Sequence, residues 1–223
     1  MIYWFIIVVV ISIVLVFNLD KLRRKTTLEL RKILYLDHNV ALYISLLNNK
    51  RLRLIYTNAT IEILKLDAWI FQNDDNKIEE SFENLSHFHL TKNQKIDIAT
   101  RKISYYCSIN DKDNALEALE DIKKLTQNKK KLHNLVEESS LIVDIYIHHD
   151  ISRKDDLLIM EKEDQDKNRK GLTNFRLAKL EYYQNKNNEV DYYLKRAIVF
   201  LQDEKWLEIA KQCSDNHSLL AKY

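Results

Sequence analysis

Histidine pairs are the residues of this sequence whose type best suits metal binding or acid–base chemistry. They occur as His87-Phe88-His89 and as His148-His149. Neighbouring and alternate residues of a helix point to different faces, so neither pair presents two imidazoles to one ion. Both pairs also fall near predicted helix ends. We therefore interpret them as solvated surface histidines and predict no metal site.

Motifs for catalysis are missing for a reason of composition. The 223 residues include one glycine and no proline, so a Gly-rich phosphate loop or a dinucleotide fingerprint is excluded. Neither a G-x-S-x-G elbow nor an H-E-x-x-H sequence occurs. Cys107 and Cys213 lie far apart without zinc-site spacing, and we interpret them as free thiols in a reducing compartment. The sequence predicts that the protein is not an enzyme and uses no cofactor.

The charge balance gives no reason to expect a nucleic-acid partner. The formal net charge is +2, which creates no global field for a polyanion. A basic run at residues 123–131 and an acidic run at residues 155–166 are interpreted as solvated faces or links. The alternative is that these runs steer a charged partner.

Tyrosines are the side chains best placed to bind another protein. Two adjacent pairs lie near predicted helix ends, at residues 105–106 and 182–183. Adjacent side chains on a helix cannot both point inward, so one of each pair is free to line a concave surface, where tyrosine favours peptide contacts. The predicted partner-binding set comprises Tyr105, Tyr146, Lys179, Tyr182 and Tyr183.

A repeat of about 37 residues supplies the elements that would position these side chains. Turn-like polar clusters recur along the chain at residues 37–39, 73–76, 110–114, 149–156 and 185–188. Four clusters end in a capping residue with an acid three positions later. These pairs are Asn76 with Glu79, Asn114 with Glu117, Ser152 with Asp155, and Asn188 with Asp191.

Apolar residues at helical spacing follow each cap, and an aromatic-rich helix precedes each turn. A unit of helix, short turn, helix and longer polar link is typical of an α-solenoid. The longer links are expected at residues 48–50, 91–95, 127–131 and 161–171. The segment 204–213, which contains Trp206, Ile209 and Ala210, is predicted to be a capping helix.

Part of this pattern resembles the tetratricopeptide-repeat family. Tyr106, Ala115 and Leu119 match the aromatic, small and apolar positions of the family's pattern. A later copy matches its small and apolar positions with Ala178, Val190, Leu194 and Ala197. The family's usual glycine and proline are absent, and the period exceeds the family's length of about 34 residues. The resemblance implies about five helical hairpins over residues 28–213 and core packing as the alternative role of Trp69, Tyr106 and Tyr146.

The first nineteen residues are predicted to be an uncleaved transmembrane anchor. Residues 2–17 are apolar except for Ser12, and Leu19 extends the run. Eighteen helical residues span about 27 Å, near the lower limit for a bilayer core. Tyr3 and Trp4 suit an interfacial position. A cleaved signal peptide would need basic residues before the core and a small-residue cleavage site. A helix buried in a soluble fold is the other alternative.

Basic residues directly after the apolar run set the predicted orientation. Lys21, Arg23, Arg24 and Lys25 lie in a juxtamembrane segment, residues 20–27, whereas no basic side chain precedes the run. The positive-inside rule then places the N-terminus outside and the C-terminal domain in the cytoplasm. The same cluster suits anionic lipid headgroups.

These predictions describe an all-α protein with an anchor (1–19), a basic segment (20–27), a tetratricopeptide-like domain (28–213) and a C-terminal tail (214–223). The expected function is that of a membrane-anchored scaffold that binds a protein or peptide on the cytoplasmic face. The alternative is a chaperone-like accessory factor of secretion or envelope machinery with the opposite topology. A ligand sensor that changes solenoid curvature is a third hypothesis.

Overall fold

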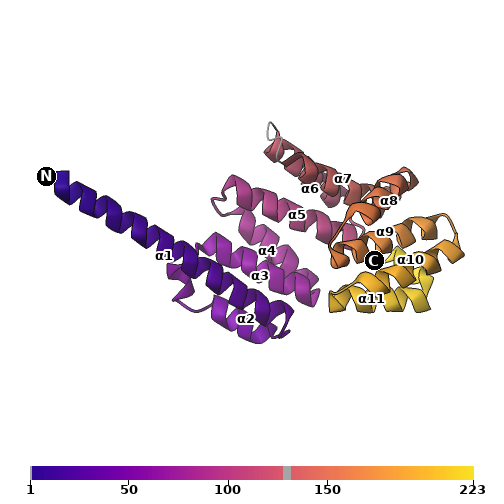
Figure 1. The fold of residues 1–223 in the computed structure, drawn as a ribbon, viewed down its shortest axis with the longest axis horizontal. Helices are drawn as coiled ribbons and strands as arrows, with labels where there is room; N and C mark the ends of the chain where they lie inside the picture. The colour runs from indigo at the N-terminus through magenta and orange to yellow at the C-terminus, as the bar shows by residue number, and fades with distance from the viewer. Residues whose placement is uncertain (1, 128–131) are drawn as a thin grey trace. The chain divides into compact units, whose positions relative to one another are not determined.

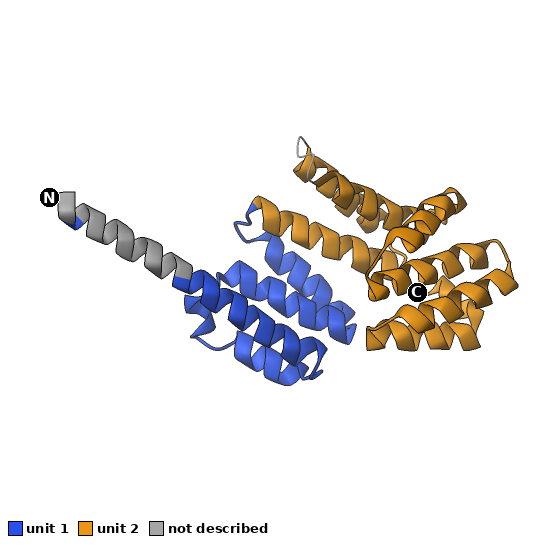
Figure 2. Cartoon of the chain, viewed as in Figure 1, with its two compact units in different colours: residues 1–91 blue, residues 92–223 orange. Residues whose placement is uncertain are grey.

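The computed structural model of the protein is all-helical, as the sequence predicts (Figure 1). It describes the backbone of residues 2–127 and 132–223 and, within these, the side chains other than those of residues 2, 3 and 5–17. Eleven α-helices occupy the described residues. The chain divides into two compact units, residues 1–91 and 92–223 (Figure 2). Within each unit, helices that follow one another in sequence pack in pairs.

Unit 1 is a stack of four helices with an apolar interior. Its elements are α1 (Ile2–Tyr35), α2 (Val40–Leu47), the 3-10 helix η1 (Leu52–Leu54), α3 (Asn58–Gln72) and α4 (Asp75–Ser86). Each α-helix packs on the next one along the chain. Leu34, Leu47 and Leu66 are fully buried there, and burial of each such side chain contributes about 1.5–3 kcal/mol.

Unit 2 is organised around one central helix. Its elements are α5 (Lys92–Ser108), α6 (Lys112–Thr126), α7 (His133–Tyr146), η3 (Ile151–Arg153), α8 (Lys154–Glu163), α9 (Lys167–Tyr183), α10 (Asn187–Phe200), α11 (Glu204–Asp215) and η4 (His217–Ala221). Helix α9 contacts α7, α8, α10 and η4. Because it is covered on several sides, nine of its 17 residues are buried, including polar ones.

One turn geometry recurs five times along the chain. All non-glycine residues with positive φ in the described backbone lie in these turns, at φ between 50° and 59°: His38, Asn73, Asn110, His149 and Asn185. They are 35, 37, 39 and 36 residues apart. Asparagine and histidine are the side chains that tolerate this left-handed conformation best after glycine. The predicted repeat of turns is therefore confirmed, in a chain that has almost no glycine.

The predicted cap residues were wrong by two or three positions in four turns. In three of these turns the residue directly after the left-handed one caps with its side chain instead. Asp74 accepts from the Lys77 N–H and Asp111 from the Asn114 N–H, both at 3.2 Å, and Asp150 accepts from the Ser152 N–H at 2.9 Å. Before α10 the corresponding residue, Lys186, makes no side-chain capping bond. The left-handed residue ends one helix within a single position, so the residue after it already occupies the N-cap position of the next helix. The predicted caps lie inside the first turns of helices α4, α6, η3 and α10: Asn76, Asn114, Ser152 and Asn188.

The link predicted at residues 161–171 is mostly helix. Helix α8 continues to Glu163, and α9 begins at Lys167. Gly171 is buried within α9, where an added Cβ would lie 2.7 Å from both Cγ and the backbone nitrogen of Leu201. The single glycine thus permits close packing rather than a flexible link. Helix α5 begins at Lys92, within the predicted link 91–95, and most of the link 127–131 lies outside the described residues.

The two ends of the chain differ in how much of them the structure describes. The predicted anchor, residues 1–19, lies largely outside the described side chains, although Trp4 and Leu19 are described and exposed. Helix α1 runs from Ile2 through the basic segment and ends at Tyr35. Among the side chains that are described, no helix is long and apolar enough to cross a membrane. At the other end, η4 packs on α9 and α11 and buries Leu220.

Candidate interaction site

Three of the five predicted partner-binding residues converge in unit 2. The Nζ atom of Lys179, on α9, lies 4.8 Å from the ring centroid of Tyr146 and 5.6 Å from that of Tyr183. The same ammonium donates a hydrogen bond to the Leu220 carbonyl oxygen at 2.6 Å. Helices α7 and α9 therefore supply two aromatic faces around one cation, and η4 supplies its acceptor.

Lys179 is enclosed rather than open to a partner. Its exposed fraction is 2%, and burial lowers its pKa to about 8, against an opposing effect of Cys213 and Cys107. The thiols show the complementary shift, because burial raises the pKa of Cys213 to about 11 and that of Cys107 to about 12. The sequence placed Lys179 on the surface of a groove, and η4 covers it.

The adjacent tyrosines of α9 belong to two different apolar clusters. Their rings lie 5.8 Å apart at 58°. Tyr182 packs with Phe175, Val190 and other residues of the α9–α10–α11 core. Tyr183 packs with the cluster that contains Leu141. Both tyrosines are half-buried, whereas the sequence analysis expects one of the two to be at the surface.

Tyr105 differs from this pair. It is buried in α5, as is Tyr106, and the two ring centroids lie 5.2 Å apart. Neither ring offers an open face to another protein. Tyr146 is half-buried at the end of α7. Burial raises the pKa of Tyr146, against the opposing effect of the nearby Arg176 guanidinium. The half-buried members of the predicted set are therefore Tyr146, Tyr182 and Tyr183.

His149 extends this cluster to the surface. Its imidazole stacks on the Tyr183 ring with centroids 3.8 Å apart and 20° between planes. Partial burial and then the Lys179 charge lower the pKa of His149, so the neutral imidazole is the form that stacks near pH 7. His149 is exposed at its turn, as are His148, His87 and His89. In the part of the chain that the structure describes, no three His, Cys, Asp or Glu side chains gather as a metal site.

A buried carboxylate is the feature that sequence reasoning missed. Glu181, on α9, has no exposed side-chain surface and lies 2.5 Å from the Lys154 ammonium and 3.7 Å from that of Lys186. Its hydrogen bond is the main cause that raises the pKa of Lys154. Glu181 lies four residues after Leu177, on the same inward face of α9. That spacing was the available signal.

The comparisons with known proteins identify no family for this chain. No protein-family model matches the chain, and no curated protein or solved structure shows a significant match. The fold itself defines an all-helical protein whose successive helices pack in pairs. The cluster around Lys179 is then the best-defined candidate for recognition.

Proposed function

We propose that this protein is a membrane-tethered scaffold. A tetratricopeptide-like helical repeat, held on the cytoplasmic face by an N-terminal helix, binds a protein or peptide partner. The observation that carries this proposal is a turn that recurs five times, with a left-handed residue between two helices at intervals of 35 to 39 residues. In four of the five turns, the two α-helices that the turn joins pack on each other. Repetition of one helical hairpin is the construction principle of α-solenoids, whose concave faces bind extended ligands.

The residues that resemble the tetratricopeptide pattern support the repeat. Tyr106 lies in the last turn of α5, while Ala115 and Leu119 lie on α6, which packs against α5. The later copy has Ala178 on α9 and the remaining positions on its packed partner α10. All of these side chains are buried: Tyr106, Ala115, Leu119, Ala178, Val190, Leu194 and Ala197. They therefore act at the contact between the two helices of a hairpin, where the family places them.

Binding rather than catalysis fits the chemistry of the candidate site. The Lys179 ammonium is already engaged by the Leu220 carbonyl and by aromatic faces, so it is not presented to a substrate. Near it, Tyr183 and the exposed His149 offer amphipathic surface, and Tyr182 lies beside Tyr183. Aromatic side chains of this kind lose little conformational entropy on binding and are frequent at interface centres.

The length and composition of α1 support the proposed tether. This helix carries the apolar run predicted as the anchor and continues without a break to Tyr35. A scaffold fixed in this way meets its membrane-associated partners at a raised effective concentration. The basic residues that follow the apolar run favour the cytoplasmic orientation.

Site-specific photo-crosslinking in intact membranes tests the partner-binding part. A benzophenone amino acid would replace Tyr182 or Tyr183, and Tyr192, which is exposed on α10 of the same unit, is the matched control. We expect one discrete protein to be captured from positions 182 and 183 and not from 192. Equal capture at all three positions, or none, would contradict the proposed binding surface.

A further inference from the structure

A loop of unit 1 is fastened to α1 beside the basic segment. This loop, residues 48–57, contains η1 and is called the η1 loop here. The Arg23 Nε donates to the Ile55 carbonyl at 2.8 Å, and the Tyr56 hydroxyl donates to the Arg23 carbonyl at 2.9 Å. The Tyr56 and Thr27 hydroxyls also lie 2.8 Å apart. The η1 loop is thus held at a fixed height on α1.

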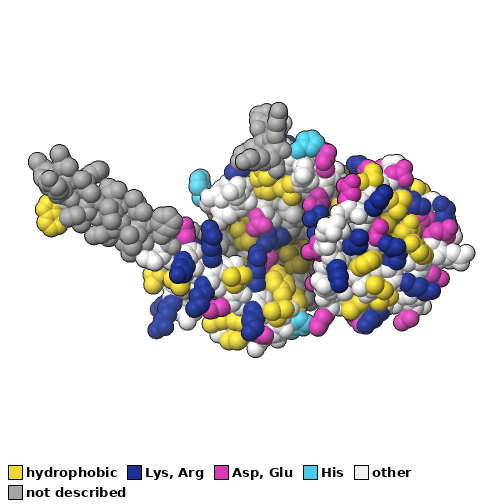
Figure 3. Space-filling view, in the orientation of Figure 1, with side chains coloured by type: hydrophobic (Ala, Val, Ile, Leu, Met, Phe, Trp, Pro, Cys, Tyr) yellow, Lys and Arg dark blue, Asp and Glu magenta, His cyan; other side chains and the backbone are white. Residues whose placement is uncertain are grey.

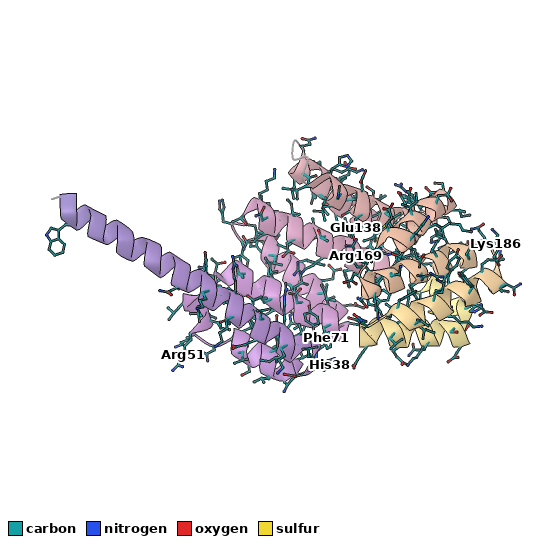
Figure 4. All side chains as sticks on the ribbon, in the orientation of Figure 1. His38, Arg51, Phe71, Glu138, Arg169 and Lys186 are labelled. Carbon is teal, nitrogen blue, oxygen red and sulfur yellow. The ribbon has the colours of Figure 1, made fainter. Side chains whose placement is uncertain are left out.

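Together these segments form a strongly cationic surface. Three basic side chains of the η1 loop join the four of the juxtamembrane segment, and all are exposed: Lys50, Arg51, Arg53, Lys21, Arg23, Arg24 and Lys25. The η1 loop contains no acid, and the one acid of the juxtamembrane segment, Asp20, pairs with Arg23 at 3.4 Å. Figure 3 shows lysine and arginine side chains gathered on this part of unit 1, and Figure 4 places Arg51 on the η1 loop. The surface is complementary to a layer of negative charge.

The same loop presents a leucine to solvent. Leu54 has an exposed fraction of 83%, the highest of the large apolar side chains that the structure describes. Its neighbour Leu52 is buried in the core of unit 1. Leu54 directly follows Arg53, and Lys50 and Arg51 lie on the same loop. An exposed leucine close to basic residues is typical of elements that enter the headgroup–acyl boundary.

The height of the loop matches a membrane surface. This step rests on the proposed function, in which residues 1–19 span the hydrocarbon. Arg23 lies four residues beyond Leu19, which is about 6 Å along a helix. The headgroup region on each side of a bilayer is about 5–7 Å thick. A loop fastened at Arg23 therefore lies at the level of the headgroups.

We propose that the η1 loop is a second membrane contact. Lys50, Arg51 and Arg53 bind the headgroups of anionic lipids, and Leu54 enters the boundary of the acyl chains. Nucleic acid is the other polyanion that a basic surface attracts, but single strands are bound through exposed aromatic platforms. The aromatic residue of this loop, Tyr56, is buried. The exposed leucine favours lipid.

Spin labels on the full chain, reconstituted in vesicles, test this contact. The labelled variants are Leu54→Cys and, as the matched control, Leu36→Cys, since Leu36 is also highly exposed in unit 1 and lies 17 residues beyond Leu19. The native Cys107 and Cys213 are buried, and the labelled unsubstituted chain gives their background. Oxygen and a water-soluble nickel complex report the depth of each label.

We expect the label at position 54 to lose nickel accessibility and gain oxygen accessibility in vesicles that contain phosphatidylserine. The shift should be absent with phosphatidylcholine alone and abolished by Arg51→Gln with Arg53→Gln, while the label at 36 stays in water. Equal nickel accessibility at 54 and 36 in both lipids overturns the proposal. So does an RNA oligonucleotide that binds through the arginines while label 54 stays in water. Failure of the chain to float with either vesicle contradicts the anchor, and the loop contact with it.

Discussion

The two units of this protein differ in what they bury. In unit 1 the interior is mostly hydrocarbon, and no charged side chain of its described residues is buried. Among these residues, the buried polar groups are the hydroxyls of Ser81, Tyr43 and Tyr56. In unit 2 the interior includes Asn174, Lys179 and Glu181. A buried charge costs several kcal/mol unless it is paired. The described interior of unit 1 therefore has no buried charge to lower its stability. Unit 2, in contrast, has polar groups buried near its candidate interaction site, and their burial costs free energy.

This contrast predicts that loss of a charge has different consequences in the two units. Charges of unit 1 act at its surface, through pairs such as Lys25 with Glu29, which are exposed and 3.9 Å apart. Unit 2 also has two charged side chains inside it, Lys179 and Glu181.

Removal of the main partner of Glu181 should give the largest effect. Lys154→Met leaves a fully buried carboxylate with only Lys186 at 3.7 Å, so we expect a loss of about 3–5 kcal/mol in the free energy of unfolding. Urea unfolding of the full chain in detergent measures it. Lys25→Met in unit 1 is the control, with an expected loss below about 1 kcal/mol.

A second substitution sharpens this test. Glu181→Leu added to Lys154→Met removes the stranded charge and should restore most of the lost stability. Equal losses from Lys154→Met and Lys25→Met would show that the two units do not differ as described.

The pH dependence of the free energy of unfolding should show the effect of burying Lys179. Its pKa is about 8 in the folded chain, against an ordinary value of 10.5, so below pH 8 both states are protonated and the cost of burial is complete. Between these values the unfolded chain holds a proton that the folded chain lacks, and stability rises with pH. Relative to Lys179→Met, the unsubstituted protein should gain about 3 kcal/mol across this window.

The comparison with Lys179→Met is needed because neighbouring groups act in the opposite sense. Burial raises the pKa of the Cys107 and Cys213 thiols and of the Tyr146 and Tyr183 hydroxyls, so these groups lower stability as the pH rises above about 9. They are present in both proteins, and their effects largely cancel in the difference. A difference that stays flat from pH 7 to 11 would mean that Lys179 is not held as described.

The smallest effect should come from the η1 loop of unit 1. Tyr56→Phe removes the hydroxyl that contacts Arg23 and Thr27, at a cost of about 1 kcal/mol. Amide hydrogen exchange should accelerate in residues 50–55. Tyr43→Phe, which removes a hydroxyl bonded to the Leu64 carbonyl, should cost a similar amount without that acceleration. Unchanged exchange in Tyr56→Phe would show that the hydroxyl does not hold the loop.

Local chemistry made the repeat of turns predictable. Asparagine, aspartate and histidine cluster where a chain with a single glycine must turn sharply, and the five left-handed residues lie in or beside those clusters. The cap positions were less predictable, because several residues of each cluster are good caps. Only the backbone decides that Asp74 and Asp111 cap, rather than Asn76 and Asn114.

The burial of Lys179 in the candidate site could not be predicted from the spacing of residues in the sequence, because it depends on contacts between distant parts of the chain. The sequence brought Tyr146, Lys179 and Tyr183 into one set, but the contact between Lys179 and Leu220 joins residues 41 positions apart. A segment treated as a tail therefore covers a lysine predicted to face a groove. Gly171 shows the same limit, since its close approach to Leu201 is set by the packing of α9.

The location of the C-terminal domain tests whether the protein is tethered to the membrane with its helical domain in the cytoplasm. Fusions of the full chain to alkaline phosphatase and to green fluorescent protein, each at the C-terminus, would be expressed in a bacterium and measured in the membrane fraction. The account predicts a fluorescent fusion, an inactive phosphatase, and loss of both fusions from membranes when residues 1–19 are deleted. An active phosphatase with a dark fluorescent fusion would contradict it and would support the extracytoplasmic accessory factor.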